Sequence, residues 1–167
     1  NTVSTQSPYP TFRTAPSSGQ SVTFSVGFGG GARYNPPKET LWAVIESLDP
    51  LAFLFMGDNV YIDMPTRRDV QRLMYYRRQL RGEYKSFAAR TGIYSVWDDH
   101  DFGVNDSAGG LQIDVPAWKL PVWDVYCENW VNPSYGGGPT QPGCWYSFML
   151  GDVEIFMPDG RYYRDFS

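Results

Sequence analysis

Residues 51–63 read LAFLFMGDNVYID and contain the clearest strand pattern of the chain. Six apolar residues, 51–56, lie between Asp49-Pro50 and Gly57, which interrupt regular structure on both sides. A short continuous apolar run between such breakers is typical of a strand that is buried on both faces, as in a parallel sheet. Asp58 follows the run at once, so the sequence predicts a carboxylate at the carboxyl end of a buried strand.

A second acidic segment, WDDHDFGVND, occupies residues 97–106 and follows a short strand pattern over 93–97. It holds four carboxylates and the only histidine of the chain. Carboxylates this close together raise one another's pKa, and a bound cation removes that cost. A solvated acidic turn or a helix N-terminus would also suit aspartate, but no clear helix pattern follows before Pro116. The segment favours a site for a hard metal ion.

Strand and helix patterns alternate along the rest of the chain. The sequence predicts strands over 21–28, 51–56, 93–97, 144–150 and 153–157, and helices over 37–48, 68–80 with an extension toward 90, and 116–130. This alternation is typical of an α/β protein, in which ligands bind beyond the carboxyl ends of the strands. Asp58, residues 98–101 and Asp159 each follow a predicted strand, so we expect them at one edge.

Asp58 and Tyr61 are spaced so that both side chains can point at one position. A carboxylate can bridge two metal ions, and a phenolate is a hard ligand suited to Fe³⁺. A purely structural alternative is that residues 57–59 form a turn and that Tyr61 is a packed aromatic residue. The spacing alone leaves both interpretations open.

Composition excludes several functional classes. The 167 residues suffice for one domain with a core, and the net charge of −4 argues against non-specific nucleic-acid binding, which needs a basic surface. The longest apolar stretch, 51–57, is far shorter than the roughly 20 residues of a membrane-spanning helix. Residues 1–20 are predicted to form a linker or tail, and 21–167 the domain. Cys127 and Cys144 could form one disulfide or stay as free thiols.

Three segments offer positive charge or backbone amides for an anion. The glycine-rich stretch GFGGGARY, 27–34, could cradle an anion with its N–H groups, although it lacks the pattern of a P-loop. The arginines within 67–81 are interpreted as a solvated or packing face. Arg161 and Arg164 follow a strand, and arginine binds phosphate oxygens bidentately, so these two are the better phosphate candidates.

These motifs, in this order, resemble the PhoD-like alkaline phosphatases of the calcineurin-like metallophosphoesterase superfamily. The matching segments are FGGGARY at 28–34, GDNVYID at 57–63, WDDHDFGVND at 97–106, PGCW at 142–145 and DGRYYRD at 159–165. The resemblance implies a central β-sandwich flanked by helices, and hydrolysis of phosphate monoesters or diesters by a metal-activated water. It also implies Ca²⁺ together with Fe³⁺, and a secreted, periplasmic or cell-surface location.

The resemblance assigns roles to individual residues. Asp58 would be the metal-bridging carboxylate and Tyr61 the Fe³⁺ ligand. Asp99 stands where the superfamily has a metal-binding asparagine, and Asn105 is a further candidate ligand. Residues 105–107 also match a glycosylation sequon, which a buried ligand could not use.

Three more residues are assigned to catalysis and substrate binding by the same resemblance. His100 would contact the scissile phosphate and stabilise charge in the transition state, with Asp101 orienting its ring. Arg161 would lie on the substrate side of the site.

The chain departs from the family pattern in two places. Residues 29–31 are glycines where PhoD-type proteins often supply a cysteine ligand, so one iron ligand is missing or replaced. The later histidine motifs are absent, so we expect an N-terminal half of the catalytic domain, truncated at its C-terminus. Two hypotheses follow. One is a metal-dependent phosphatase or phosphodiesterase. The other is a non-catalytic phosphatase-like module that acts as a structural or binding subunit, with a protein partner covering its open edge.

Overall fold

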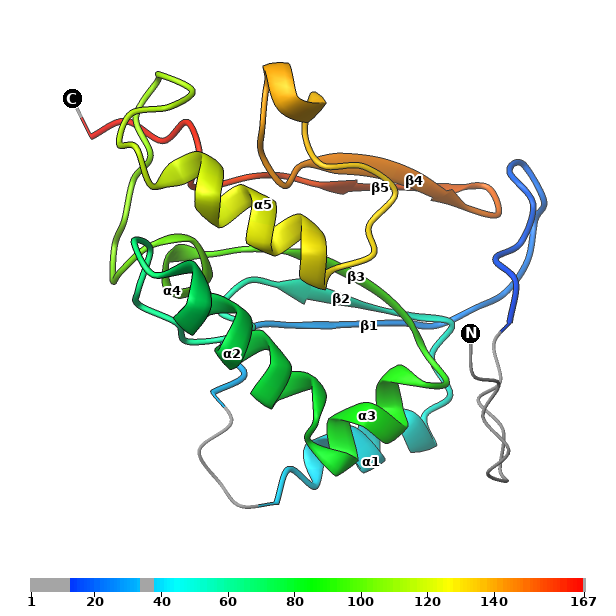
Figure 1. Cartoon of the computed structure of the whole chain (residues 1–167). Helices are drawn as coiled ribbons and strands as arrows, with labels where there is room; N and C mark the ends of the chain where they lie inside the picture. The colour runs from blue at the N-terminus through cyan, green and yellow to red at the C-terminus, as the bar shows by residue number, and fades with distance from the viewer. Residues whose placement is uncertain (1–12, 34–37, 167) are drawn as a thin grey trace, which may run out of the picture.

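The computed structural model describes residues 13–33 and 38–166 of the chain. In these residues, strands β1 (Val26–Gly29), β2 (Ala52–Met56) and β3 (Gly92–Val96) form a parallel sheet in the order β1-β2-β3 (Figure 1). Strands β4 (Tyr146–Leu150) and β5 (Val153–Met157) form a separate antiparallel hairpin. The helices are α1 (Leu41–Ser47), α2 (Arg68–Gln79), α3 (Gly82–Ala88), α4 (Asp99–Phe102), α5 (Lys119–Asn129) and the 3₁₀ turn η1 (Gly138–Thr140).

The predicted α/β class, with parallel strands and flanking helices, is confirmed. The strand predicted over 21–28 is shorter and later, because β1 pairs with β2 only from Val26 opposite Ala52. Gly27 lies beside the Phe53 ring of β2, where a Cβ atom would come within 2.6 Å of a ring carbon. A glycine in this strand therefore makes room for a large aromatic neighbour.

The helices pack on the face of the sheet that carries Phe53 and Phe55. Trp42 of α1 stacks on Phe87 of α3, with ring centroids 5.2 Å apart. The same tryptophan ring also lies against Phe53 and Phe55 of β2. The sequence pattern predicts Leu41, Ile45 and Leu48 as the core side of this helix. That is wrong for Leu41 and Leu48, which are 58% and 73% exposed, because the helix turns its single tryptophan toward the sheet.

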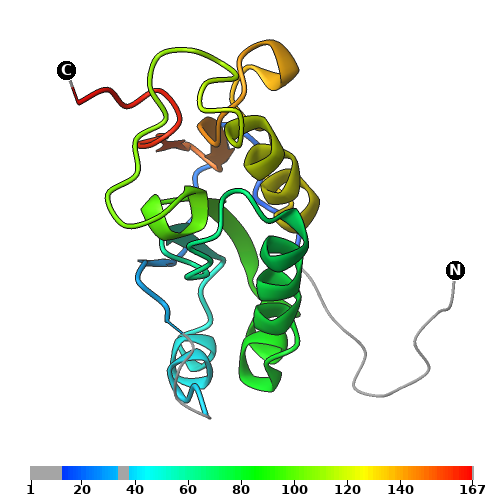
Figure 2. The same ribbon diagram turned by 60° about the vertical axis from the view of Figure 1, so that its left-hand side comes forward.

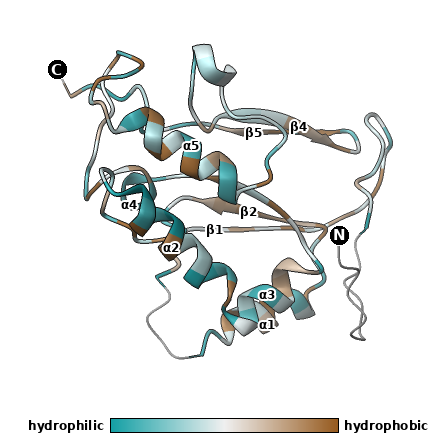
Figure 3. Ribbon diagram, viewed as in Figure 1, coloured by the Kyte–Doolittle hydropathy of each residue, from teal (hydrophilic) through white to brown (hydrophobic). Residues whose placement is uncertain are grey.

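The single long helix expected from residue 68 toward 90 is two helices, α2 and α3, separated at residues 80–81. Figures 1 and 2 show α2 and α5 side by side on one side of the three-stranded sheet. Arg68 pairs with Asp124 (3.2 Å) and Arg72 with Glu128 (2.6 Å) across this helix contact. Figure 3 colours most of α2 as hydrophilic and much of β2 as hydrophobic. Arg68 and Arg72 of this helix are exposed, whereas Arg78 is buried and pairs with Glu39.

The β4–β5 hairpin has the turn predicted at residues 151–152, with Gly151 at φ +63°. It contacts the parallel sheet through Phe148, which stacks on Tyr94 with ring centroids 3.8 Å apart. The complete β-sandwich expected from the resemblance stays a prediction. Both cysteines are free.

Residues 13–20, the described part of the predicted tail, make contacts with the rest of the chain. In the described part of the predicted tail, Gly19 donates to the Gly151 carbonyl (2.8 Å) and Arg13 pairs with Asp49 (2.8 Å). Residues 1–12 lie outside the described part, and the domain boundary at residue 20 stays a prediction. Among the described residues, no helix is long and apolar enough to span a bilayer.

Candidate metal centre

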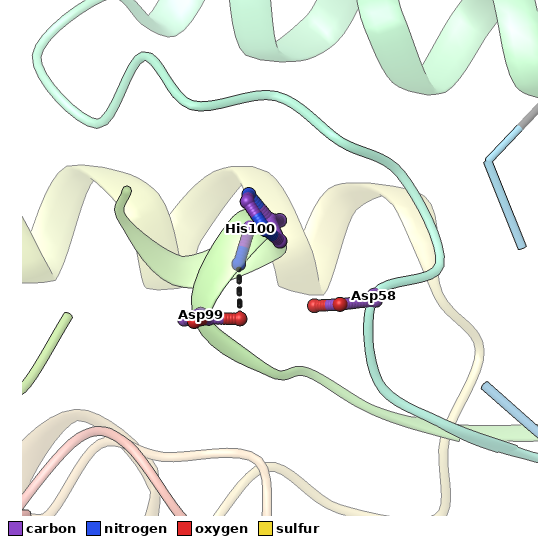
Figure 4. Close-up of side chains that lie close together, drawn as sticks. All are labelled: Asp58, Asp99 and His100. Carbon is purple, nitrogen blue, oxygen red and sulfur yellow. Dashed lines mark hydrogen bonds between the residues drawn. The ribbon is translucent and has the colours of Figure 1, made fainter. Parts of the chain in front are cut away.

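Asp58, Asp99 and His100 come together at the carboxyl edge of the parallel sheet. One potential ligand atom from each lies within 4.8 Å of the others, and Figure 4 shows the two carboxylates pointing toward one another. Asp58 comes from the segment after β2, and the other two residues come from the start of α4, after β3. The sequence prediction that acidic residues after these strands share one edge is therefore correct for both segments.

Parallel pairing of β2 and β3 sets the distance between the two acidic segments. Met56 pairs with Val96, so Gly57 and Asp98 leave the sheet side by side. A Cβ atom on Gly57, at φ +106°, would lie 2.5 Å from the Cβ atom of Asp98. Only glycine allows the two segments to approach this closely, and that approach brings the Asp58 and Asp99 carboxylates into one cluster.

The backbone around this cluster is held in unusual conformations. Within the described residues, four non-glycine residues have positive φ; Asp58 (+52°) belongs to the cluster, and Asp63 (+54°) and Asp106 (+59°) bond to its other two members. Aspartate tolerates this left-handed region at a cost of about 1–2 kcal/mol. Such conformations persist where the surroundings enforce them, and they gather at ligand-binding sites.

Asp101 enforces the conformation of the Asp58 segment. Its buried carboxylate accepts hydrogen bonds from the backbone N–H groups of Asn59 (3.1 Å), Val60 (2.6 Å) and Asp98 (3.2 Å). Burial raises the pKa of Asp101 to about 7, although the three donors oppose that shift. Asp101 thus ties α4 to the residues that follow Asp58.

The expectation that 97–106 has no helix is wrong. Asp99–Phe102 forms one helical turn, with Asp98 and Asp101 in a reciprocal capping box. The helix N-terminus considered as an alternative is therefore present beside the cluster. The Asp-x-x-Asp spacing of residues 98–101 was the available sequence signal for it.

Asp63, rather than Asp101, holds the imidazole ring of His100. Nδ1 of His100 lies 2.6 Å from a carboxylate oxygen of Asp63, so the predicted orienting role of Asp101 is wrong. Neighbouring residues of a helix point in different directions: Asp101 is buried against the Asn59 and Val60 backbone, while the His100 ring bonds to Asp63. Burial opposes protonation of His100, but the bond to Asp63 and the nearby carboxylates together raise its pKa.

Tyr61 lies beside Asp58, and its role as an Fe³⁺ ligand stays a prediction. Its hydroxyl shares a hydrogen bond with the Asp58 carboxylate, and its ring centroid lies 4.4 Å from that of His100. Burial is the main cause that raises the pKa of both Asp58 and Tyr61; the shared hydrogen bond counteracts the shift at Asp58 and adds to it at Tyr61.

Oδ1 of Asp58 has no hydrogen-bond partner in the described residues although it is buried. A buried carboxylate oxygen without a partner is costly, and a cation would satisfy it. For Asp99, burial alone would raise the pKa, but the Asp106 backbone N–H (2.6 Å) and the charge of Arg161 lower it. The carboxylates, the phenol and the imidazole form a donor set that fits a hard cation.

Arg161 does not present a free guanidinium to a substrate. It is 8% exposed, it bonds to Asp98, and it lies 3.6 Å from Asp99 and 3.2 Å from the Ser107 carbonyl. The structure therefore gives Arg161 a different use from the predicted one, because it neutralises the carboxylates next to the cluster.

Among the described residues, neither Asn105 nor Asp159 has a hydrogen bond to Asp58, Asp99 or His100. Asn105 is exposed and donates to Asp106 (2.7 Å), so its role as a ligand stays a prediction. The Asp159 carboxylate accepts from the Trp97 indole (2.9 Å), from Cys144 N (2.9 Å) and from two backbone N–H groups of its own turn. Asp159 follows the antiparallel hairpin rather than the parallel sheet, and its bond to Trp97 holds it beside the carboxyl end of β3.

Comparison with known proteins supports the fold. No family profile matches the chain, and no curated protein matches it in sequence. Among solved structures, the "Structure of PhoD" superposes with a TM-score of 0.76 at 18% sequence identity, and the match covers 92% of this chain and 34% of the PhoD chain. The chain therefore has the fold of about one third of PhoD, as the PhoD-like motifs led us to expect.

Proposed function

We propose that this chain carries part of the active site of a metal-dependent phosphate-ester hydrolase. The observation that carries the proposal is the buried, partnerless Oδ1 of Asp58, which lies in a cluster with Asp99 and His100. The PhoD fold and the PhoD-like motifs support it, because both point to phosphoester hydrolysis by metal-bound water.

Asp58, Tyr61 and Asp99 would hold the cation, with Asn105 as a candidate further ligand. A bound cation would supply an acidified water molecule and would neutralise charge on the phosphate. Oxygen donors and one imidazole suit Ca²⁺, Fe³⁺ or Mn²⁺. The Asp58 carboxylate, close to Asp99 on one side and to Tyr61 on the other, is the group best placed to contact two ions.

His100 acts on the phosphate side of the cluster. Asp63 occupies Nδ1, which leaves Nε2 as the ring atom that faces a ligand. A raised pKa favours the protonated ring, which can donate a hydrogen bond from Nε2 to a phosphate oxygen and stabilise negative charge there. Asp101 fixes the loop that carries Asp58, because it accepts hydrogen bonds from the backbone N–H groups of Asn59 and Val60.

The chain spans about a third of the PhoD structure, so the activity of a whole PhoD-like enzyme is a proposal for it. The same holds for a location outside the cytoplasm. The non-catalytic module considered above stays a prediction, and no contact in the described residues favours it over the hydrolase.

The test is metal-dependent hydrolysis by this chain. p-Nitrophenyl phosphate and bis-p-nitrophenyl phosphate are offered with Ca²⁺, Mn²⁺ or Fe³⁺, to the wild-type chain and to Asp58→Asn. We expect turnover that needs metal and disappears in Asp58→Asn, whereas Asp152→Asn, in the exposed hairpin turn, keeps it. Metal binding that is unchanged in Asp58→Asn would contradict the proposed site, and turnover that needs no metal would contradict the metal-dependent reaction.

A further inference from the structure

A phosphate that reaches the cluster enters a strongly acidic environment. Asp58, Asp63 and Asp99 all lie in or against it, and Asp98 is adjacent. A bound cation would offset part of this negative charge, and a cationic side chain nearby would add to its attraction for an anionic substrate. Arg161 cannot serve, because its guanidinium is buried and already engaged by carboxylates.

Arg33 is placed to serve. Its guanidinium carbon lies 5.5 Å from the ring centroid of Tyr61, whose hydroxyl bonds to Asp58. Its side chain is exposed, and no described carboxylate lies within ion-pair distance of it. Arg33 follows β1, so it leaves the parallel sheet at the same carboxyl edge as the cluster.

Residues 29–31, shortly before Arg33, are glycines, so this glycine-rich segment places no side chain beside the Tyr61 hydroxyl. Gly31 N donates to the Gly57 carbonyl (3.1 Å), which fixes the glycine-rich segment against the segment that carries Asp58. A Cβ atom on Gly31, at φ +69°, would lie 3.8 Å from the Tyr61 hydroxyl. The backbone thus passes beside the phenol, and a small oxyanion meets backbone rather than side chain there.

We propose that Arg33 binds the phosphate group of the substrate and selects phosphate monoesters over diesters; this rests on the proposed function. A guanidinium takes two phosphate oxygens in a bidentate pair. A monoester has three non-bridging oxygens, so two can face Arg33 while the third faces the metal cluster. A diester has only two, and it must give up either the bidentate pair or the contact with the cation.

The experiment is calorimetric titration of the Mn²⁺-loaded chain with methyl phosphate and with dimethyl phosphate. We expect Arg33→Ala to weaken methyl phosphate binding at least tenfold and dimethyl phosphate binding much less, with Mn²⁺ affinity unchanged. Arg33→Lys should recover part of the loss, because it restores charge without the bidentate geometry. The control is Arg90→Ala, which removes an exposed arginine before β3, at the opposite edge of the sheet.

The possible outcomes separate this inference from the proposed function. Equal methyl phosphate affinity in wild type and Arg33→Ala, with Mn²⁺ bound to both, would overturn the role of Arg33 alone. Equal losses for the two esters would overturn the monoester selectivity. Failure of the wild-type chain to bind Mn²⁺ would overturn the proposed function, and this inference with it.

Discussion

Two polar groups of side chains adjoin β3, and they differ in whether their hydrogen bonds are complete. The Ser95 network consists of Ser95, Tyr126, Asn132 and Tyr146, and the Asp58 cluster consists of Asp58, Asp99 and His100. In the network, Tyr126 donates to the Ser95 carbonyl (2.8 Å), and Asn132 both donates to that carbonyl (3.0 Å) and accepts from Ser95 N (3.0 Å). No buried side-chain polar atom of these four residues lacks a partner.

The Asp58 cluster is incomplete by the same measure. Asp58 keeps a buried oxygen without a donor, beside a second carboxylate, and two of the residues around it have strained backbones. A satisfied buried network favours one folded structure, whereas an unsatisfied one costs free energy unless a ligand completes it. The comparison sets a network whose buried polar side-chain atoms are all paired against a cluster with an open carboxylate oxygen, and that oxygen is the basis of the metal site proposed above.

Substitution of Asn132 should give the largest loss of stability. Asn132→Ala leaves Ser95 N without its acceptor (3.0 Å), whereas the Tyr146 hydroxyl keeps its bond to the Ser95 carbonyl (3.1 Å). A buried group left unsatisfied costs about 1–3 kcal/mol, so the free energy of unfolding should fall by about that much. Urea denaturation of the metal-free chain measures this. A loss below about 1 kcal/mol would break the comparison.

Substitution of Asp58 should give the opposite pattern. Asp58→Asn removes one of two facing carboxylates, so the metal-free chain should keep its free energy of unfolding within about 1 kcal/mol or gain some. Its affinity for Mn²⁺ should fall by about 100-fold or more, as measured by calorimetry. A strong destabilisation without metal would show that Asp58 serves the fold.

Two tyrosines allow a matched and smaller test. Tyr126→Phe removes a hydroxyl that bonds Ser95 Oγ (2.7 Å) and the Ser95 carbonyl, which should cost about 1–2 kcal/mol. Tyr61→Phe removes a hydroxyl at the open cluster and should cost less than about 0.5 kcal/mol without metal. Thermal unfolding of both variants, with and without Mn²⁺, checks this. Equal costs in metal-free protein would contradict the distinction.

Lys119 is a third case for comparison with the Ser95 network and the Asp58 cluster, because it is a buried charged group that has hydrogen-bond partners. Its ammonium donates to the Gly110 carbonyl (3.0 Å) and to that of Gln112, and it lies 4.2 Å from the Tyr162 ring centroid. Burial nevertheless lowers its pKa to about 8 from an ordinary 10.5.

The sign of the resulting pH effect follows from proton binding. Between pH 8 and 10.5 the unfolded chain keeps the Lys119 proton and the folded chain loses it, so this group makes the free energy of unfolding rise with pH. The slope is at most about 1.4 kcal/mol per pH unit. Lys119→Met should remove it, as seen by urea denaturation at pH 8, 9 and 10. Parallel profiles for the two proteins would refute this.

The sequence predicted which segments meet, because parallel strands send their carboxyl ends to one edge. Asp58, Tyr61, Asp99 and His100 could be found in this way. The residues that hold them could not, since the choice between Asp63 and Asp101 as the partner of His100 depends on how a single helical turn is oriented. The pairing of Arg161 with Asp98, 63 positions away, depends on how the segment after β5 folds back.

The central claim is that Asp58 and Asp99 hold a cation beside His100. The most direct measurement is anomalous diffraction from crystals of this chain grown with Mn²⁺, recorded at the manganese absorption edge. We expect an anomalous peak within coordination distance of the Asp58 and Asp99 carboxylates, and no such peak in Asp58→Asn crystals. A well-ordered cluster with no peak, or with manganese bound only elsewhere, would contradict the claim.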